Sequence, residues 1–269
     1  MLRLPAVSGR FYPADANELA SQVRSLTKHA PGSAVRSAPA CLVPHAGYMY
    51  SGHVAGAVYG KIAIPQKIIV LGVRHSPRGQ AAAILTEGAW RTPLGDAPID
   101  GELGSELRKA CPLLREDAIA HAGEHSLEVQ LPFLQVLAPG FKFVPIALGT
   151  LHYESLAEVG AGIARVLRAA REPILLLTTS DLNHYEDDAT TRKKDGMAMA
   201  QLTAMDPRGL FEVCGREDIS MCGLGPAVAM LTALNTIGAT KAEVVKYATS
   251  ADVSRDTETV VGYAGMIFA

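Results

Sequence analysis

Two histidines stand in short polar loops, each directly after an apolar segment typical of a buried β-strand. His45 follows Ala40–Val43, and His75 follows Ile68–Leu71. If these strands run parallel, their carboxyl ends meet at one edge of the sheet, where ligands bind in such folds. Two neutral imidazoles together with an anionic group are a typical ligand set for a transition metal. The pattern therefore predicts a metal site, although a single loop histidine is more often a hydrogen-bonded structural residue.

A carboxylate and a third histidine follow another apolar segment, Ile174–Thr178. Asp181 and His184 are three residues apart, which places them on one side of a helical turn. The carboxylate would then hydrogen-bond the imidazole and fix its tautomer, preparing His184 as an acid–base group or as a ligand. Alternatively, Asp181 caps a helix that runs through Thr191 to Met205. The two interpretations are compatible.

One of the four cysteines differs from the others in its surroundings. Cys222 lies in a glycine-rich segment just before a predicted helix. A thiol at a helix N-terminus has a lowered pKa and acts more readily as a metal ligand or nucleophile. The other three are better interpreted as small buried apolar residues; they are Cys41, Cys111 and Cys214.

The segment from His121 to His125 matches the H-x-x-E-H pattern of a zinc peptidase family. That pattern needs both histidines on one face of a continuous helix. Gly123 interrupts the segment, and helical spacing begins only after it, so we do not expect a peptidase. We expect His125 to line the pocket from the loop before that helix. Glycine-rich nucleotide-binding motifs and the serine-hydrolase elbow are missing, so no nucleotide cofactor is expected.

Strand-like and helical segments alternate along the chain. The candidate strands are Ala40–Val43, Ile68–Leu71, Ala82–Leu85, Phe143–Ala147, Ile174–Thr178, Val244–Tyr247 and Val260–Phe268. The clearest helices are Asp15–His29, Glu154–Ala170 and a segment between Gly225 and Gly238. The first begins with a capping box, Asp15 to Glu18. This alternation predicts an α/β fold with a mainly parallel central sheet between helical layers. We expect a single domain over residues 1–269, with a boundary near Gly149–Glu154 as the alternative.

Composition narrows the class of protein. The 269 residues are 48% hydrophobic with a net charge of −2, which supports a packed core and disfavours nucleic-acid partners. No window is long and apolar enough for a membrane span, and the N-terminus does not resemble a signal peptide. The four scattered cysteines fit a reducing cytoplasm. We therefore expect a cytoplasmic protein without membrane or nucleic-acid partners.

Taken together, these segments make the chain resemble the Memo family, whose bacterial and archaeal members are often called AmmeMemoRadiSam system protein B. The resemblance runs nearly end to end and depends on the order of its short motifs. These are Ser8–Pro13, Pro44–Tyr48, Leu71-Gly72 with His75, Arg91–Asp96, Glu124–Glu128, Ser180-Asp181 with His184, and Cys222-Gly223.

The resemblance implies a fold shared with class III extradiol ring-cleaving dioxygenases, which hold non-heme Fe(II) with two histidines and a glutamate. His45 and His75 match the two histidine ligands. Cys222 matches the family's cysteine, which stands where the dioxygenases have their glutamate. His184 matches their acid–base histidine, and Asp181 is its neighbour. Family members are reported to bind iron or copper at such a site.

The chain departs from the family pattern in one motif and from the dioxygenases in one ligand. The second motif often reads Gly-Pro-Ser-His-His, but here Arg74 precedes His75. The added positive charge would either repel a metal or attract an anionic substrate. Cysteine in place of the dioxygenase glutamate gives a softer ligand, which favours Cu(I) or Zn(II).

The leading hypothesis is a Memo-like metal-binding protein with a His45/His75/Cys222 site in an open pocket. Its cofactor would be Fe(II) or copper, with zinc as a further option. Oxygen-dependent or redox chemistry would act on a small aromatic or carboxylated substrate, with His184, oriented by Asp181, moving the proton. The residues expected to line the pocket are Tyr48, Arg74 and His125.

Two other hypotheses remain open. The first is a binding or scaffold protein that uses a vestigial pocket to recognise a peptide, a metabolite or a partner protein without turnover. The second is hydrolysis by a zinc-bound water at the same site. In each case the ligand is a small molecule or a peptide, and a homo-oligomer is possible.

Overall fold

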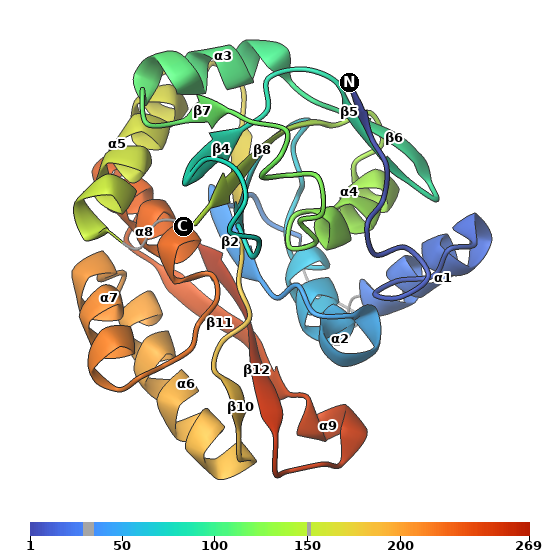
Figure 1. Cartoon of the computed structure of the whole chain (residues 1–269), viewed down its shortest axis with the longest axis vertical. Coiled ribbons are helices and arrows are strands. Elements are labelled where there is room, and N and C mark those ends of the chain that lie inside the picture. The colour runs from blue at the N-terminus through green and yellow to red at the C-terminus, as the bar shows by residue number, and fades with distance from the viewer. Residues whose placement is uncertain (29–34, 150–151) are drawn as a thin grey trace.

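A mixed nine-stranded sheet forms the centre of the computed structural model, which describes residues 1–28, 35–149 and 152–269 (Figure 1). Four neighbouring strands at its centre run parallel: β2 (Ala40–Val43), β9 (Ile174–Thr179), β3 (Lys67–Val73) and β8 (Lys142–Leu148). The flanking strands are β4 (Ala82–Ile84), β7 (Arg115–Glu116), β10 (His184–Glu186), β11 (Ala242–Thr249) and β12 (Val260–Phe268). Strand β12 pairs antiparallel with β2, β10 and β11.

Helices cover both faces of this sheet (Figure 1). One face carries α3 (Gly101–Ala110), α5 (Tyr153–Ala169), α6 (Asp188–Thr203), α7 (Pro207–Arg216) and α8 (Leu224–Ile237). The other face carries α1 (Ala16–Leu26), α2 (Tyr48–Tyr59), α4 (Leu131–Leu137) and a small sheet of β1 (Leu2–Arg3), β5 (Ala89–Thr92) and β6 (Gly95–Pro98). A short 3₁₀ helix, Glu128–Gln130, precedes α4, and α9 (Ala251–Ser254) precedes β12. The predicted α/β fold is confirmed.

The central strands bury both of their faces. Leu42 in β2 packs into one apolar cluster, while Cys41 and Val43 pack into the cluster on the opposite face. All four residues of β2 are buried. This is why the strands read as continuous apolar runs rather than as an alternating pattern.

The parallel strands end in register, and this alignment positions the polar loops. Val43 of β2 pairs with Thr179 of β9, and Leu71 of β3 pairs with Thr178. His45, His75 and Asp181 each lie two residues beyond the end of their strand. The three predicted loops therefore meet at one edge of the sheet.

The observed helix ends largely agree with the predicted ones. Asp15 caps α1 by accepting hydrogen bonds from the backbone N–H groups of Asn17 and Glu18, both at 2.9 Å. Gly238 ends α8 with φ of +90°, a conformation that glycine adopts without strain. His29, at the end of the predicted first helix, lies outside the described residues, as do residues 150 and 151 of the alternative domain boundary.

One proposed cap is wrong. Helix α6 begins at Asp188 and is capped by Asp187, whose side chain accepts from Thr190 N. Asp181 lies further upstream, in the loop after β9, and binds other groups. Within the described residues, no helix combines the length and apolarity needed to cross a bilayer.

A buried carboxylate holds the loop that carries His184. Asp195 of α6 accepts hydrogen bonds from Asn183 N at 2.8 Å and from the Tyr247 hydroxyl at 2.7 Å. A Cβ at Gly262 would lie 1.8 Å from Asp195 Oδ2, so only glycine fits opposite this carboxylate. Burial raises the pKa of Asp195 to about 6, although its hydrogen-bond donors act in the other direction.

We predict that Asp195→Asn changes the pH dependence of stability. Because the folded-state pKa lies above the value of about 3.9 for an unfolded aspartate, the folded state binds more protons between those values. The contribution of Asp195 to the free energy of unfolding therefore falls as the pH rises from about 4 to 6. The amide carries no charge, so the variant should gain about 2 kcal/mol relative to wild type between pH 4 and pH 7.

Denaturant unfolding at several pH values measures this difference. The exposed substitution Glu106→Gln serves as the control and should track the wild type. A difference between wild type and Asp195→Asn that stays constant from pH 4 to pH 7 would contradict the assignment.

Candidate metal centre

The loops at the sheet edge surround a cavity of about 720 Å³. Residues from the β2, β3, β9 and β10 loops line it, together with parts of the N-terminal segment and β12. Of the residues singled out from the sequence, six line it: His45, His75, His125, Asp181, His184 and Cys222. Segments from distant parts of the chain therefore share one space.

Three imidazoles lie together within this cavity. One ring nitrogen from each of His45, His75 and His125 lies within 4.8 Å of the others, a spacing that could hold a metal ion. The rings of His75 and His125 stack with centroids 4.6 Å apart, and His45 meets both edge-on at 5.3 and 5.6 Å. The first two predicted ligands thus come together, and a histidine predicted only to line the pocket joins them.

A buried carboxylate fixes the orientation of His75. Nδ1 of His75 donates to Glu124 Oε1 at 2.8 Å, and the backbone N–H of His75 donates to Oε2 at 2.7 Å. Ser126 N also donates to this carboxylate. Burial alone would raise the pKa of Glu124, but the hydrogen bonds and charge of His75 lower it to about 2. Burial lowers the pKa of His75, but the hydrogen bond and charge of Glu124 outweigh this and raise it, so Nδ1 keeps its proton and Nε2 binds a metal once it has lost its own.

Hydrogen bonds from the protein core fix His45. Its Nδ1 lies 2.9 Å from Thr179 Oγ1, which accepts from Gln130 Nε2 at 3.1 Å. Gln130 is itself held, since its amide donates to Pro44 O and accepts from the Tyr59 hydroxyl. Burial, followed by repulsion from the neighbouring imidazoles, lowers the pKa of His45 well below its usual value. His45 is therefore neutral, as a metal ligand must be.

Cys222 contacts the cluster through His45. Its Sγ lies 3.2 Å from His45 Nε2 and accepts a hydrogen bond from Asp181 N at 3.3 Å. The group of ligand atoms that all lie within 4.8 Å of one another consists of histidine nitrogens and does not include this sulfur. The prediction of a lowered pKa is wrong, because burial raises the pKa of Cys222 and the nearby Asp181 carboxylate adds to this. Desolvation outweighs the field of helix α8, which begins two residues later.

Asp181 and His184 do not form the predicted pair. Asp181 Oδ1 accepts from His45 N at 2.8 Å, whereas His184 Nδ1 donates to Ser220 O at 2.9 Å. The backbone N–H of His184 also donates to Ser220 Oγ. The reason is local: His184 begins strand β10, so residues three apart do not share a helical face. Ser220 therefore sets the tautomer of His184 and leaves Nε2 free.

Two residues expected in the pocket lie elsewhere. Tyr48 is buried at the start of α2, where its hydroxyl donates to Val129 O at 2.6 Å. The Arg74 guanidinium donates to the carbonyls of Arg78 and Gly79, both at 3.1 Å. Neither residue is among those that line the cavity. The predicted influence of Arg74 on the metal or substrate is therefore not supported by its position.

Several residues of the cavity were not singled out by their chemistry. Arg10 and Phe11 line it from the Ser8–Pro13 motif, and Tyr50 and Tyr263 line it from α2 and β12. The ring of Phe11 meets His125 edge-on at 5.0 Å. Only the family-like motif around Arg10 marked this segment in the sequence.

The H-x-x-E-H segment does not form a peptidase site. Turns occupy residues 119–123, so His121 and His125 do not share a helix. His121 is buried, donates to Asp117 O from Nδ1 and packs edge-on against Trp90 at 5.8 Å. Glu124 orients His75 instead of acting as a base on a helix.

Comparison with known proteins agrees with this architecture. The sequence pattern of the family described as Memo-like protein matches residues 3–267. A MEMO1 family protein of Methanopyrus kandleri is 40% identical, covering 100% of this chain and 99% of the relative. One from Aquifex aeolicus is 40% identical, covering 99% of each chain.

A solved structure shares the fold alone. The crystal structure of an uncharacterized protein from Escherichia coli K12 superimposes with a TM-score of 0.58 at 13% identity, covering 86% of this chain and 99% of that one. The full-length sequence matches establish the family. The chain belongs to the Memo-like protein family.

Proposed function

We propose that this protein binds a single transition-metal ion through His45 and His75, and that the cavity beside it takes a small organic ligand for oxygen-dependent or redox chemistry. The group of three close imidazole nitrogens carries the proposal. The ion would be Fe(II) or copper, with zinc as a further option. The geometry favours His125 as the third ligand, whereas the family pattern favours Cys222.

The donor set suits a borderline transition metal. Imidazole nitrogens prefer iron, copper and zinc over hard cations such as Mg²⁺. His75 has Nδ1 bound to Glu124, which leaves Nε2 directed to the common space, whereas His45 has Nδ1 beside Thr179 and Nε2 3.2 Å from Cys222 Sγ. The Glu124 carboxylate behind His75 makes that imidazole a stronger donor. A bound redox-active ion would supply electron-transfer chemistry beside the cavity.

The chain's own residues supply ligand binding and proton transfer. His184 lines the cavity, and its Nδ1–H donates to Ser220 O, so its Nε2 is free to accept a proton. Tyr50 and Tyr263 provide aromatic surface, and Arg10 adds a positive charge. These features support a small aromatic or carboxylated substrate.

A non-catalytic binding protein is the second candidate. Burial raises the pKa of Cys222, so without a metal its thiol stays protonated and unreactive. A cavity of about 720 Å³ is large enough for a metabolite or for the side chains of a peptide. The same residues would then recognise a ligand without turnover.

We propose that the protein is located in the reducing cytoplasm, whichever of the two functions it has. The four cysteines are free in the structure. Free thiols persist where the glutathione and thioredoxin systems keep them reduced.

Metal titration under anaerobic conditions tests the ligand assignment. The wild type should bind one equivalent of Fe(II) or Cu(I). His45→Ala or His75→Ala should weaken binding by more than the roughly 10- to 100-fold that loss of a hydrogen-bond partner costs. His152→Ala, on an exposed residue, is the matched control. Undiminished binding after loss of both His45 and His75 would refute the site.

The third ligand is decided by two further variants in the same titration. If His125 completes the set, His125→Ala should weaken binding strongly while Cys222→Ser has a small effect. The reverse order would assign Cys222, as in the family pattern. Equal, negligible effects would show a two-histidine site.

Glu124→Gln should weaken metal binding by about 10- to 100-fold. The amide cannot provide the negative charge that holds the His75 proton on Nδ1. Calorimetric titration measures the change, Glu106→Gln is the exposed control, and thermal unfolding checks that the variant is folded. Wild-type affinity in a folded Glu124→Gln protein would contradict the proposed role of this carboxylate.

Oxygen uptake separates the enzyme from the binding protein. With metal bound and a panel of catechols and carboxylated aromatics, the enzyme should consume O₂, and His184→Ala should reduce turnover while metal affinity stays unchanged. Ligand binding that a chelator leaves unaffected, with no O₂ uptake from any compound, would favour the binding protein.

A further inference from the structure

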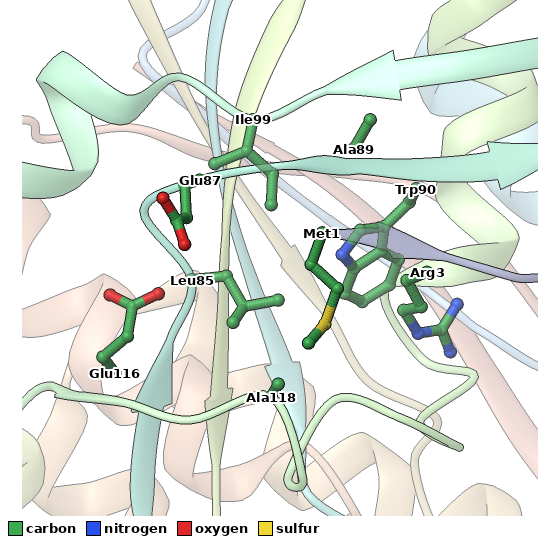
Figure 2. A pocket seen from close by; sticks show the side chains of 9 residues that line it. All are labelled: Met1, Arg3, Leu85, Glu87, Ala89, Trp90, Ile99, Glu116 and Ala118. Atoms are coloured by element: carbon green, nitrogen blue, oxygen red, sulfur yellow. The ribbon is translucent and has the colours of Figure 1, made fainter.

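Two cavities of the protein differ in the side chains that they leave without a partner. The smaller, of about 130 Å³, lies between β5 and the first residues of the chain (Figure 2). Here both oxygens of Glu116 accept hydrogen bonds from Thr86, and the carbonyl of Met1 accepts from Ala89 N at 3.0 Å. The cavity of the candidate metal centre instead has an aromatic side chain at its edge, Tyr185, which is 76% exposed.

Tyr185 has a backbone conformation that tyrosine rarely adopts. Its φ is +63°, in the left-handed region. Within the described residues, three other non-glycine residues share a positive φ: Met205, Asp218 and Arg255. These three lie at or just after the C-terminal ends of α6, α7 and α9, where such a conformation is common. Tyr185 lies in the middle of strand β10, so a helix end does not explain its conformation.

A β-bulge accounts for the geometry at this position. His184 pairs with Val261 of β12. Glu186 pairs with the adjacent Val260, so Tyr185 between them is the extra residue of the bulge. In bulges that contain a left-handed residue, that residue is usually glycine. A tyrosine in its place strains the backbone, and strain of this kind concentrates at functional sites.

The residues on both sides of Tyr185 are anchored, whereas its own ring is not. The backbone N–H of His184 donates to Ser220 Oγ at 2.8 Å, and Glu186 forms a salt bridge with Lys194 at 2.7 Å. The Tyr185 hydroxyl has no hydrogen bond within the described parts of the chain, and its ring meets the His184 imidazole at 5.5 Å between centroids. The strained backbone therefore presents an exposed aromatic ring beside the proposed acid–base residue.

The remaining walls of the cavity are also rich in aromatic rings. Phe11, Tyr50 and Tyr263 line it from three other segments. The ring of Phe11 packs edge-on against His125, and Tyr263 is only 2% exposed, so these two rings are already covered by protein. Tyr185 has aromatic surface left to offer. Contact between aromatic rings contributes binding free energy beyond the area that it buries, so this surface favours a planar aromatic ligand over a saturated one.

We propose that Tyr185 is a specificity-determining residue, whose ring stacks on the aromatic ring of the ligand that binds beside His184. It selects aromatic compounds over saturated compounds that carry the same polar groups. The proposal rests on the ligand-binding cavity of the proposed function. It depends neither on the identity of the metal nor on turnover.

Matched pairs of compounds test this selection. The pairs are benzoate with cyclohexanecarboxylate, 4-hydroxybenzoate with 4-hydroxycyclohexanecarboxylate, and catechol with 1,2-cyclohexanediol. Calorimetry measures both affinities in each pair, on chelator-treated and on Zn(II)-loaded protein. Tyr185→Leu should reduce the preference for the aromatic member by about 2- to 10-fold, the range for one aromatic contact. Tyr185→Phe should keep the preference. Tyr153→Leu, which removes a ring that does not line the cavity, is the control.

Two small substitutions separate the ring from the backbone conformation. Tyr185→Ala and Tyr185→Gly both remove the ring, so they should lose the preference to the same extent. Only glycine adopts the left-handed conformation without strain. Tyr185→Gly should therefore unfold at a higher urea concentration than Tyr185→Ala, the reverse of the order found in the interior of an ordinary strand.

Two binding results would overturn the proposal. One is an unchanged preference in Tyr185→Leu, and the other is failure of every aromatic compound to bind at millimolar concentration. A lower urea midpoint for Tyr185→Gly than for Tyr185→Ala would contradict the strained conformation. Metal titration distinguishes these failures from failure of the metal site, because Tyr185→Leu should bind metal as the wild type does.

Discussion

The registered ends of three neighbouring parallel strands are the constraint on which the candidate metal centre depends. Strands β2, β9 and β3 stop at the same edge of the sheet, and the polar residues follow at the same distance from each end. A slip of one residue in any strand would turn its side chains to the opposite face of the sheet. The buried apolar clusters on both faces prevent such a slip, so the packing of the core determines the geometry of the site.

Hydrogen bonds to protein groups then fix the orientation of the histidine side chains that the strand ends bring together. Glu124 holds His75, Thr179 holds His45 and the Ser220 carbonyl holds His184. The N-terminal strand contributes through Arg3, which donates to the carbonyl oxygens of His121 and Glu124. The loop that carries Glu124 and His125 is thus tied to the small sheet as well as to the main one, and the imidazoles are held before any ligand arrives.

Much of this arrangement could be predicted from the sequence. It depends on the spacing of apolar residues and on polar residues that stand at fixed places beside strands and helices. Apolar runs marked the central strands, the Asp15 cap marked the start of α1, and the loop positions of His45 and His75 indicated their convergence. The family resemblance indicated the same pair of histidines. These signals arise from burial and from hydrogen bonds between residues close in the chain.

The contacts and pKa values that the sequence analysis missed or predicted wrongly depend on competing physical effects. A single sequence does not show which of these effects is stronger. A spacing of three residues joins Asp181 and His184 only in a helix, and the backbone there is extended. A helix N-terminus favours a thiolate, but at Cys222 desolvation and the neighbouring Asp181 carboxylate raise the pKa instead. The contact between Glu124 and His75 spans 49 positions without any periodic signal, so only the folded chain reveals it.

The pairing of β12 with β2 affects the order in which the cavity can form. His45 and Cys222 are 177 positions apart, and the strand that closes the sheet beside β2 comes from residues 260–268. Contacts over such spans form late, after the entropy of closing long loops has been overcome. The cavity, which Val261 and Tyr263 of β12 help to line, therefore forms only after this long-range pairing is in place.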